Sequence, residues 1–191
     1  EMAQPTKKPD EPSPSPGSAA GAAAVSEILK EPAEIKYARE LEALRQNEKD
    51  EVPSAWKLSP RSVLAYITGT KKPLTATFDG KEVEVPISRK FFGDDTIVER
   101  SIVTLASERA LLLVGDPGTG KSWLSEHLSA AISGTSALIV QGTAGTSEEH
   151  IKYGWNYASL LAEGPSKKAL VPSPVFRAME NGQFARFEEV T

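Results

Sequence analysis

Cysteine is absent from this chain of 191 residues. Disulfides, thiolate catalysis and thiolate metal sites are therefore excluded, which is consistent with a reducing, cytoplasmic compartment. The sequence also lacks a secretory signal pattern and any apolar run near the roughly 20 residues that span a bilayer, so we expect no membrane span. Its formal net charge of −4 gives no general attraction to nucleic acid. We therefore expect no nucleic-acid partner.

Large apolar residues are scarce in residues 1–24, where five prolines stand among Ser, Gly and Ala. This composition buries too little apolar surface to offset the entropy of ordering, so we predict a disordered tail. Residues 25–90 are predicted to form helical segments and a β-hairpin. Within them, apolar positions at helical spacing indicate one amphipathic helix from about 33 to 47. That helix would either pack on the domain behind it or dock a partner.

Capping and turn residues mark the next two elements. Ser59 and Pro60 can begin a short helix that Gly69 ends. Two runs of alternating polarity then flank Asp79-Gly80, which is a strong hairpin signal. The hairpin would have either a purely structural role or a role as an oligomer contact.

Apolar runs alternate with helical patterns in residues 91–191. Asp94 or Asp95 can cap a first helix, and a second fits residues 121–133. The predicted strands are residues 110–114, 136–140 and 183–187. Strands that alternate with helices indicate an α/β fold, a parallel sheet covered by helices.

Residues 115–122 read Gly-Asp-Pro-Gly-Thr-Gly-Lys-Ser, a complete G-x-x-x-x-G-K-[ST] phosphate-binding loop (P-loop). Its glycines allow successive N–H groups to face the phosphates of a nucleotide. Lys121 would reach the β- and γ-phosphates, and the Ser122 hydroxyl would bind Mg²⁺. The candidate cofactor-binding residues of the loop are Gly115, Asp116, Pro117, Gly118, Thr119, Gly120, Lys121 and Ser122.

Two acids follow the last predicted strand. Glu188 and Glu189 would emerge at its carboxyl end, where ligand sites gather in open α/β sheets. Nucleotide hydrolysis needs a carboxylate near Mg²⁺ and a polar group that positions water. We therefore predict Glu188, with Ser122, as a metal ligand and Glu189 as the residue that faces the attacking water. Without the P-loop, the same pair would indicate only a solvated strand end.

At these residues the chain resembles the AAA+ ATPases, and within them the MoxR-like branch. The resemblance covers about residues 90–191. It is carried by Phe92-Gly93-Asp94, the loop at 115–122, Pro172-Ser173-Pro174-Val175-Phe176 and Phe187-Glu188-Glu189. Ser173 stands where the family pattern has glycine, and Glu188 stands where the family usually has aspartate.

The resemblance implies a P-loop NTPase domain of the AAA+ type, of which residues 91–191 would be the N-terminal part, ending at the Walker B strand. Phe92 and Gly93 would lie near the adenine of ATP, with Trp123 in the same cofactor-binding set. Glu189 would be the catalytic glutamate, acting with Lys121. The longer side chain of Glu188 can still accept a water of the Mg²⁺ shell, although hydrolysis would be slow.

The function that this resemblance implies is ATP hydrolysis by a ring, a hexamer in the family, that remodels a protein partner. A von Willebrand factor A domain protein is the expected partner class. The chain would then be a fragment, because it stops before the sensor strand, arginine finger and helical lid. The alternative is a nucleotide-sensing module with weak or no hydrolysis. A small-molecule kinase is a third hypothesis, which the sequence supports less.

Two aromatic residues and two histidines lie outside these motifs. Trp155 and Tyr157 would be packing aromatics or, near a central pore, contacts to a substrate polypeptide. His127 and His150 lack the spacing of a metal site, so we assign both to helix-surface or capping roles.

Overall fold

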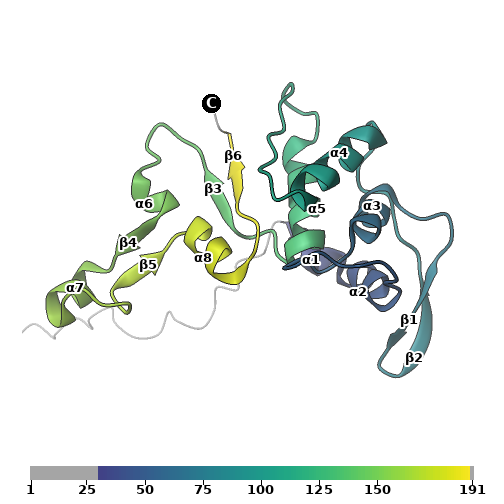
Figure 1. The fold of residues 1–191 in the computed structure, drawn as a ribbon, viewed down its shortest axis with the longest axis horizontal. Helices are drawn as coiled ribbons and strands as arrows, with labels where there is room; N and C mark the ends of the chain where they lie inside the picture. Colours follow the sequence, from purple (N-terminus) through teal and green to yellow (C-terminus); the bar gives the residue numbers. More distant parts are fainter. Residues whose placement is uncertain (1–29, 190–191) are drawn as a thin grey trace, which may run out of the picture. The chain divides into compact units, whose positions relative to one another are not determined.

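A computed structural model of the chain describes residues 30–189 (Figure 1). Apart from Lys30, these residues belong to one compact unit, Glu31–Thr191. The predicted disordered tail, residues 1–24, lies outside the described residues. None of the described helices has the length and hydrophobicity that crossing a bilayer requires.

The first part of this unit is mainly helical, and the second consists of short strands and helices. The first part contains α1 (Ala33–Lys36), α2 (Ala38–Gln46), α3 (Pro60–Thr68), β1 (Leu74–Phe78), β2 (Lys81–Val85), α4 (Asp95–Ala106) and α5 (Lys121–Ser133). The second contains β3 (Ile139–Gln141), α6 (Glu148–Ile151), β4 (Tyr153–Trp155), α7 (Tyr157–Glu163), β5 (Leu170–Pro172), α8 (Pro174–Asn181) and β6 (Arg186–Glu188).

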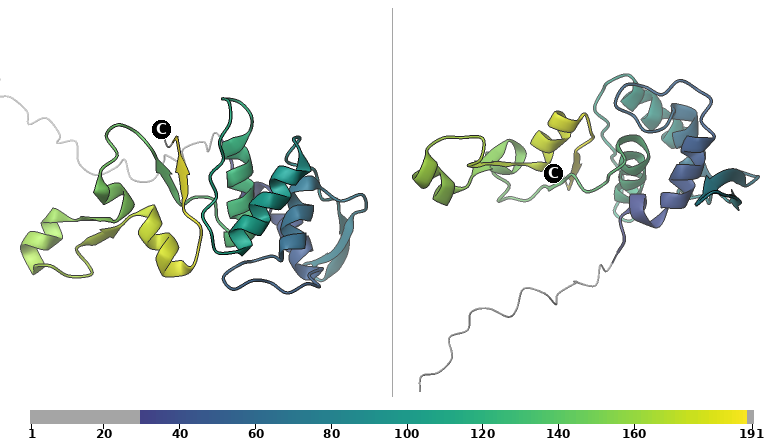
Figure 2. Two further views of the ribbon diagram at one scale, coloured as in Figure 1. Left: turned by 45° about the horizontal axis from the view of Figure 1, so that its top comes forward. Right: turned by 90° about the horizontal axis from the view of Figure 1, so that it is seen from below.

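The hydrophobic core lies among the helices of the first part. Helix α3 contacts α2, α4 and α5, and two further views show this helical cluster beside the hairpin β1–β2 (Figure 2). The core residues are Leu41, Ala43, Leu44, Leu58, Val63, Tyr66, Ile67, Ala76, Val85, Ile87, Val98, Ile102, Leu124, Leu128, Ala131 and Ile132. One core therefore draws on both sides of residue 90, and the predicted domain boundary there stays a prediction.

The helix expected over residues 33–47 is two helices. The backbone leaves the helical conformation at Tyr37, where φ is −111° and ψ is 24°. The Tyr37 ring there lies against Tyr66 and His127, with centroids 6.2 Å and 5.3 Å away. Leu41 and Leu44 of α2 are buried in the core, which supports the packed surface helix rather than a free docking helix.

The predicted helix at Ser59 and the predicted hairpin are confirmed. The Ser59 hydroxyl accepts from the N–H of Ser62 and caps α3, and Gly69 ends the helix with φ of 81°. Strands β1 and β2 pair antiparallel, with Leu74 opposite Val85. Asp79 and Gly80 both have positive φ, 51° and 75°, as a two-residue turn of this type requires.

The start of α3 carries a pH-dependent contribution to stability. The Glu48 carboxylate accepts from the Ser59 N–H at 2.9 Å and from its hydroxyl at 2.8 Å. Partial burial raises the pKa of Glu48, but hydrogen bonds from Ser59 and Ser62 outweigh it, so the pKa lies below its ordinary value of 4.5. The stabilisation is therefore complete above about pH 4.5 and is lost as the pH falls through the folded-state pKa.

We expect Glu48→Gln to lower the free energy of unfolding by about 1 kcal/mol at pH 7, since charge-assisted bonds of a largely solvated carboxylate are lost. The difference from wild type should shrink as the pH falls from 4.5 through the lower folded-state pKa, where the carboxylate of the folded wild type protonates. Urea unfolding at several pH values measures both. Glu51→Gln, at an exposed position, is the matched control, and a pH-independent loss for Glu48→Gln would contradict the prediction.

The parallel sheet is smaller than expected. Among the described residues it consists of β3 and β6, paired in parallel with Val140 opposite Phe187. Helix α5 contacts β6, and α8 contacts β3. Residues 110–114, the expected strand before the P-loop, are not a strand; Leu112 and Val114 are 74% and 84% exposed. The reason is that an apolar run becomes a strand only beside a backbone partner, and none lies next to it among residues 30–189.

The expected bounds of the other two strands also shift toward their C-terminal ends. Strand β3 begins at Ile139 rather than at residue 136, and β6 begins at Arg186 rather than at residue 183. These are the residues that pair in register with the neighbouring strand, with Ile139 opposite Arg186 and Gln141 opposite Glu188.

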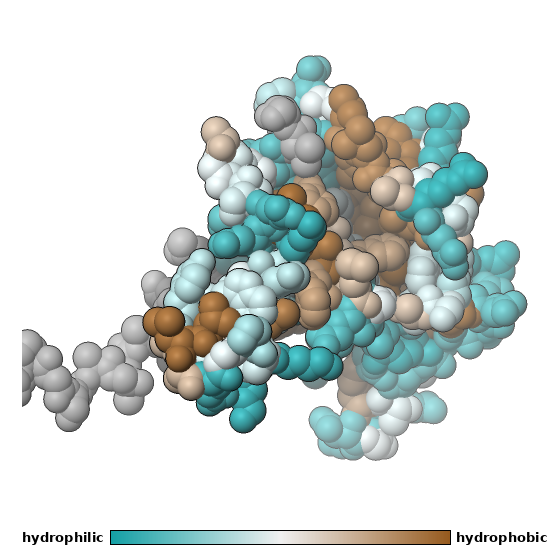
Figure 3. All heavy atoms as spheres, turned by 60° about the vertical axis from the view of Figure 1, so that its left-hand side comes forward, coloured by the Kyte–Doolittle hydropathy of each residue, from teal (hydrophilic) through white to brown (hydrophobic). Residues whose placement is uncertain are grey.

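Strands β4 and β5 form a small antiparallel pair, which α6 and α8 contact. The Tyr153 ring packs edge-on against Trp155 and Phe176, with centroids 5.7 Å and 6.4 Å away. Trp155 is thus a packing aromatic, whereas Tyr157 is 65% exposed and Leu161 is 89% exposed. Figure 3 turns this part of the molecule toward the reader and shows hydrophobic surface on it.

Candidate nucleotide-binding site

The P-loop connects residues 110–114, which have no regular secondary structure, to α5. Gly118 and Gly120 have φ of 80° and 79°, a backbone conformation that side chains disfavour. Gly120 is also the N-cap of α5 and contributes no capping side chain, which leaves the first N–H groups of this helix available to an anion. Helix α5 spans Lys121–Ser133, the bounds expected from the sequence.

The ammonium group of Lys121 lies over the P-loop. It donates to the carbonyl oxygens of Gly115 at 2.8 Å and Asp116 at 2.7 Å, and lies 3.5 Å from the hydroxyl of Thr119. All three contacts are exposed to solvent. Phosphate oxygens can therefore replace these acceptors without uncovering a buried group.

Glu188 reaches from the end of β6 to the first turn of α5. One of its carboxylate oxygens accepts from the hydroxyl of Ser122, which lies 66 positions earlier in the chain. The other accepts from the hydroxyl of Ser125 at 3.2 Å. The fold thus brings together the two residues expected at Mg²⁺, at the same end of α5 as Lys121.

Arg186 lies next to Glu188 and was missed in the sequence. Its guanidinium is 3.3 Å from the Glu188 carboxylate, and the two side chains are 10% and 16% exposed. Its Nε and Nη1 atoms are buried without a hydrogen-bond partner among the described residues. The spacing of the residues could have indicated these contacts. Residues two apart on a strand, such as Arg186 and Glu188, share a face, and residues three apart on a helix, such as Ser122 and Ser125, are neighbours.

Glu189 follows the strand with its side chain exposed and φ of 56°. The backbone at this point packs against Gly142 after β3, whose N–H donates to the Glu188 carbonyl at 2.8 Å. A Cβ on Gly142 would lie 2.7 Å from the carbonyl oxygen of Glu189. Gly142, also missed in the sequence, is therefore required for the close approach that places both acids.

The segment that carries Phe92 and Gly93, the residues expected near adenine, approaches the P-loop through the neighbouring Phe91. Phe92 is 83% exposed, and the guanidinium of Arg89 is 6.0 Å from its ring centroid. The ring next to the loop is that of Phe91, which would lie 3.8 Å from a Cβ on Gly120. The indole of Trp123 donates to the carbonyl of Lys90 at 2.7 Å, so Trp123 ties α5 to this segment.

The oxygen ligands present fit a magnesium ion. Ser122 and Glu188 supply a hydroxyl and a carboxylate, and Mg²⁺ keeps several of its waters when one or two carboxylates hold it. No group of three or more His, Cys, Asp or Glu side chains with metal-site geometry occurs within residues 30–189. The candidate site therefore suits an ion that arrives with phosphate oxygens rather than one held by protein ligands alone.

The two histidines differ from each other. His150 caps α6 through Ser147, as expected. His127 was expected on a helix surface or at a cap, but it is 1% exposed, and its Nδ1 lies 3.0 Å from the hydroxyl of Tyr66. The correction has a structural reason, because α1 and α3 both pack on α5 and cover the face that carries His127.

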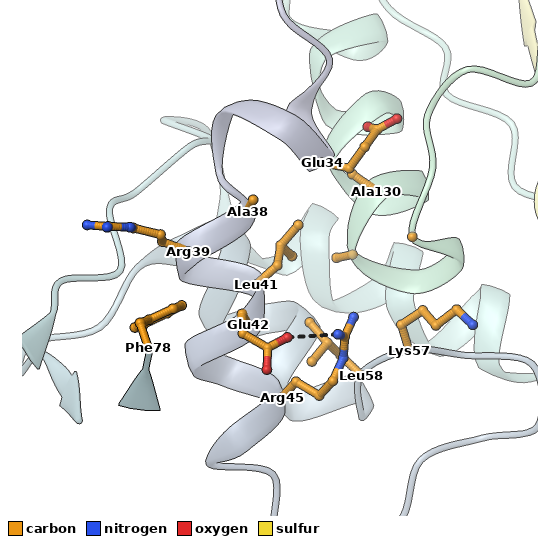
Figure 4. A pocket seen from close by; sticks show the side chains of 12 residues that line it. Glu34, Ala38, Arg39, Leu41, Glu42, Arg45, Lys57, Leu58, Phe78 and Ala130 are labelled. Atoms are coloured by element: carbon orange, nitrogen blue, oxygen red, sulfur yellow. Dashed lines mark hydrogen bonds and ion pairs between the residues drawn. The ribbon is translucent and has the colours of Figure 1, made fainter. Parts of the chain in front are cut away.

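A cavity of about 380 Å³ lies near the other end of α5, between α2 and residues 130–134 (Figure 4). Leu41 and Leu58 line it, and Arg45 points into it while paired with Glu42 at 2.8 Å. Because the P-loop precedes the first residue of α5, this cavity is separate from the candidate nucleotide site.

Comparison with known proteins supports the class that the site indicates. Residues 110–191 match the family model described as AAA domain (dynein-related subfamily). This match supports an AAA+ ATPase with a P-loop NTPase α/β fold, and it leaves the MoxR-like branch a prediction.

A particular relative is the uncharacterized protein YehL of Escherichia coli (strain K12). The chain is 46% identical to it over 164 residues, which are 86% of this chain and 42% of that protein. The chain thus spans less than half the length of this relative. No solved structure matches the chain.

Proposed function

We propose that the chain binds ATP with Mg²⁺ and hydrolyses the γ-phosphate as part of an AAA+ ATPase. The contact between Ser122 and Glu188 carries the proposal, because it joins the P-loop helix to the acidic end of β6. These are the two parts that a P-loop NTPase needs around one metal ion. When bound, Mg²⁺ would neutralise part of the phosphate charge.

In this proposal, the loop residues Gly115, Asp116, Pro117, Gly118, Thr119 and Gly120 cradle the phosphates with their main-chain N–H groups. Lys121 exchanges its bonds to the loop carbonyls for bonds to the β- and γ-phosphates. Its charge then stabilises the negative charge that spreads over the γ-phosphoryl oxygens during transfer.

Glu188 and Glu189 have different roles, one at the metal ion and one at the attacking water. Glu188 is the metal-side carboxylate, and its additional methylene relative to aspartate lets one group reach both Ser122 and Ser125. Glu189 has no hydrogen bond to another side chain within residues 30–189 and is exposed. It is therefore free to orient the water that attacks the γ-phosphate.

The wider assembly follows from the resemblance and is proposed on that basis. The chain would work in the cytoplasm as part of a homo-oligomeric ring of the MoxR-like type, a hexamer. The ring would remodel a protein partner, with von Willebrand factor A domain proteins as the class to test first. Tyr157, which is 65% exposed, is a candidate contact for a polypeptide substrate.

Isothermal titration of the wild-type chain with ATP tests the proposal. We expect binding that is tighter in excess Mg²⁺ than in EDTA, because Ser122 supplies a metal ligand. Ser122→Ala should remove most of this Mg²⁺-dependent gain, about tenfold in affinity or ~1.4 kcal/mol. Ser54→Ala, at an exposed position outside the site, is the control.

Two results would contradict the proposal. A wild-type chain that binds no ATP would remove the nucleotide function altogether. A Ser122→Ala variant with the full wild-type response to Mg²⁺ would remove the metal site at Ser122 and Glu188.

A further inference from the structure

Lys90 is a buried cation that joins several parts of the fold. Its side chain is 1% exposed and forms an ion pair with Glu40 of α2. The ammonium group donates to the Ser88 carbonyl at 2.6 Å and lies 4.8 Å and 4.4 Å from the ring centroids of Tyr37 and Tyr66. Burial lowers the pKa of Lys90, and Glu40 opposes this effect. A charge enclosed in this way stays in place, because displacement would leave Glu40 uncompensated.

The main chain of Lys90 is held on two sides. Its N–H donates to the carbonyl of Ile67 in α3 at 2.9 Å. Its carbonyl accepts from the indole of Trp123 in α5 at 2.7 Å, and Trp123 lies two positions after Lys121. Residue 90 is therefore a single point at which α2, α3 and the P-loop helix are connected.

The segment directly after Lys90 approaches the P-loop at Phe91. The Phe91 ring lies next to Gly120, and Phe92 follows with 83% of its surface exposed. Arg89 also fixes this segment, because it donates to the Phe91 carbonyl at 2.8 Å and pairs with the Asp95 carboxylate. A nucleotide with its phosphates on the loop would have its base within reach of this aromatic surface, and bases stack on aromatic side chains.

We propose that Lys90 is a positioning residue for the nucleotide base: it holds Phe91, Phe92 and Gly93 beside the P-loop and couples them to α2 through Glu40. The inference rests on the proposed function, since it places the phosphates on the loop. It adds that the affinity of the site for the base of a nucleotide depends on the buried contact that Lys90 makes between α5 and the preceding helices. The affinity of the site for the phosphates does not depend on this contact.

Two probes separate these contributions. ADP carries base and phosphates, and inorganic tripolyphosphate carries phosphates alone. For Lys90→Met we expect ADP to bind about tenfold more weakly and tripolyphosphate to stay within about twofold of wild type in calorimetric titrations with Mg²⁺. Lys90→Arg, which keeps the charge, should recover most of the ADP affinity. Lys71→Met, at an exposed lysine, is the control.

Trp123→Phe attacks the same connection more gently, because it keeps an aromatic ring while it removes the hydrogen bond to the Lys90 carbonyl. We expect a loss of ADP affinity of about threefold with unchanged tripolyphosphate binding. This variant decides the question if circular dichroism shows that Lys90→Met does not fold.

The outcomes can be told apart. Equal losses for both probes would assign Lys90 a general structural role, and unchanged ADP binding would assign it none; either result overturns the inference. A wild-type chain that binds neither probe would instead overturn the proposed function.

Discussion

Replacing Lys121 with methionine should weaken ATP binding by about a hundredfold, or ~2.7 kcal/mol, and abolish detectable hydrolysis. Methionine keeps most of the length of the side chain and removes the ammonium charge that would face the phosphates. The folded state should hardly change, because the bonds that Lys121 makes to the Gly115 and Asp116 carbonyls are exposed and water can replace them.

Calorimetric titration with ATP and a thermal melt without nucleotide measure the two effects separately. Lys167→Met, at an exposed lysine far along the chain from the P-loop, should leave ATP affinity unchanged. If Lys121→Met bound ATP as tightly as wild type, the loop at 115–122 would not be a phosphate site.

The second large effect is expected at Glu189. Glu189→Gln should lower kcat for ATP hydrolysis by about 10²- to 10³-fold, because the amide cannot accept a proton from the attacking water. ATP affinity should stay within about twofold of wild type, since in the proposed mechanism the exposed Glu189 side chain acts on the attacking water and does not bind phosphate.

Steady-state phosphate release measures kcat, and titration of the same variant with ATP measures binding. Glu180→Gln, an exposed glutamate of α8, is the matched control. Equal hydrolysis rates for wild type and Glu189→Gln would favour the alternative, a nucleotide-sensing module in which ATP occupancy rather than turnover is the signal.

Features built from neighbouring residues were predictable from the sequence. Ser59 and Asp94 cap α3 and α4 as expected, and α5 ends at Ser133, its expected bound. Caps and turns depend on hydrogen bonds between a side chain and the backbone next to it, so composition and spacing are sufficient to find them.

Features that depend on a distant partner were not predictable with the same success. Residues 110–114 have the composition of a buried strand, yet no neighbouring strand lies beside them among residues 30–189. The burial of His127 depends on α1 and α3, and the packing of Lys90 depends on Glu40 and two tyrosines. No periodicity in one segment contains this information.

The sequence by itself determined that this chain has a P-loop, because residues 115–122 form this loop from contiguous backbone whose conformations glycine permits. Only the tertiary structure decided which groups surround that loop. Glu188, Arg186 and the Phe91 ring come from other segments, and their positions follow from the packing of β6 and residue 90 against α5. Contacts between distant segments depend on how helices and strands bury their apolar faces together, which the whole chain determines at once.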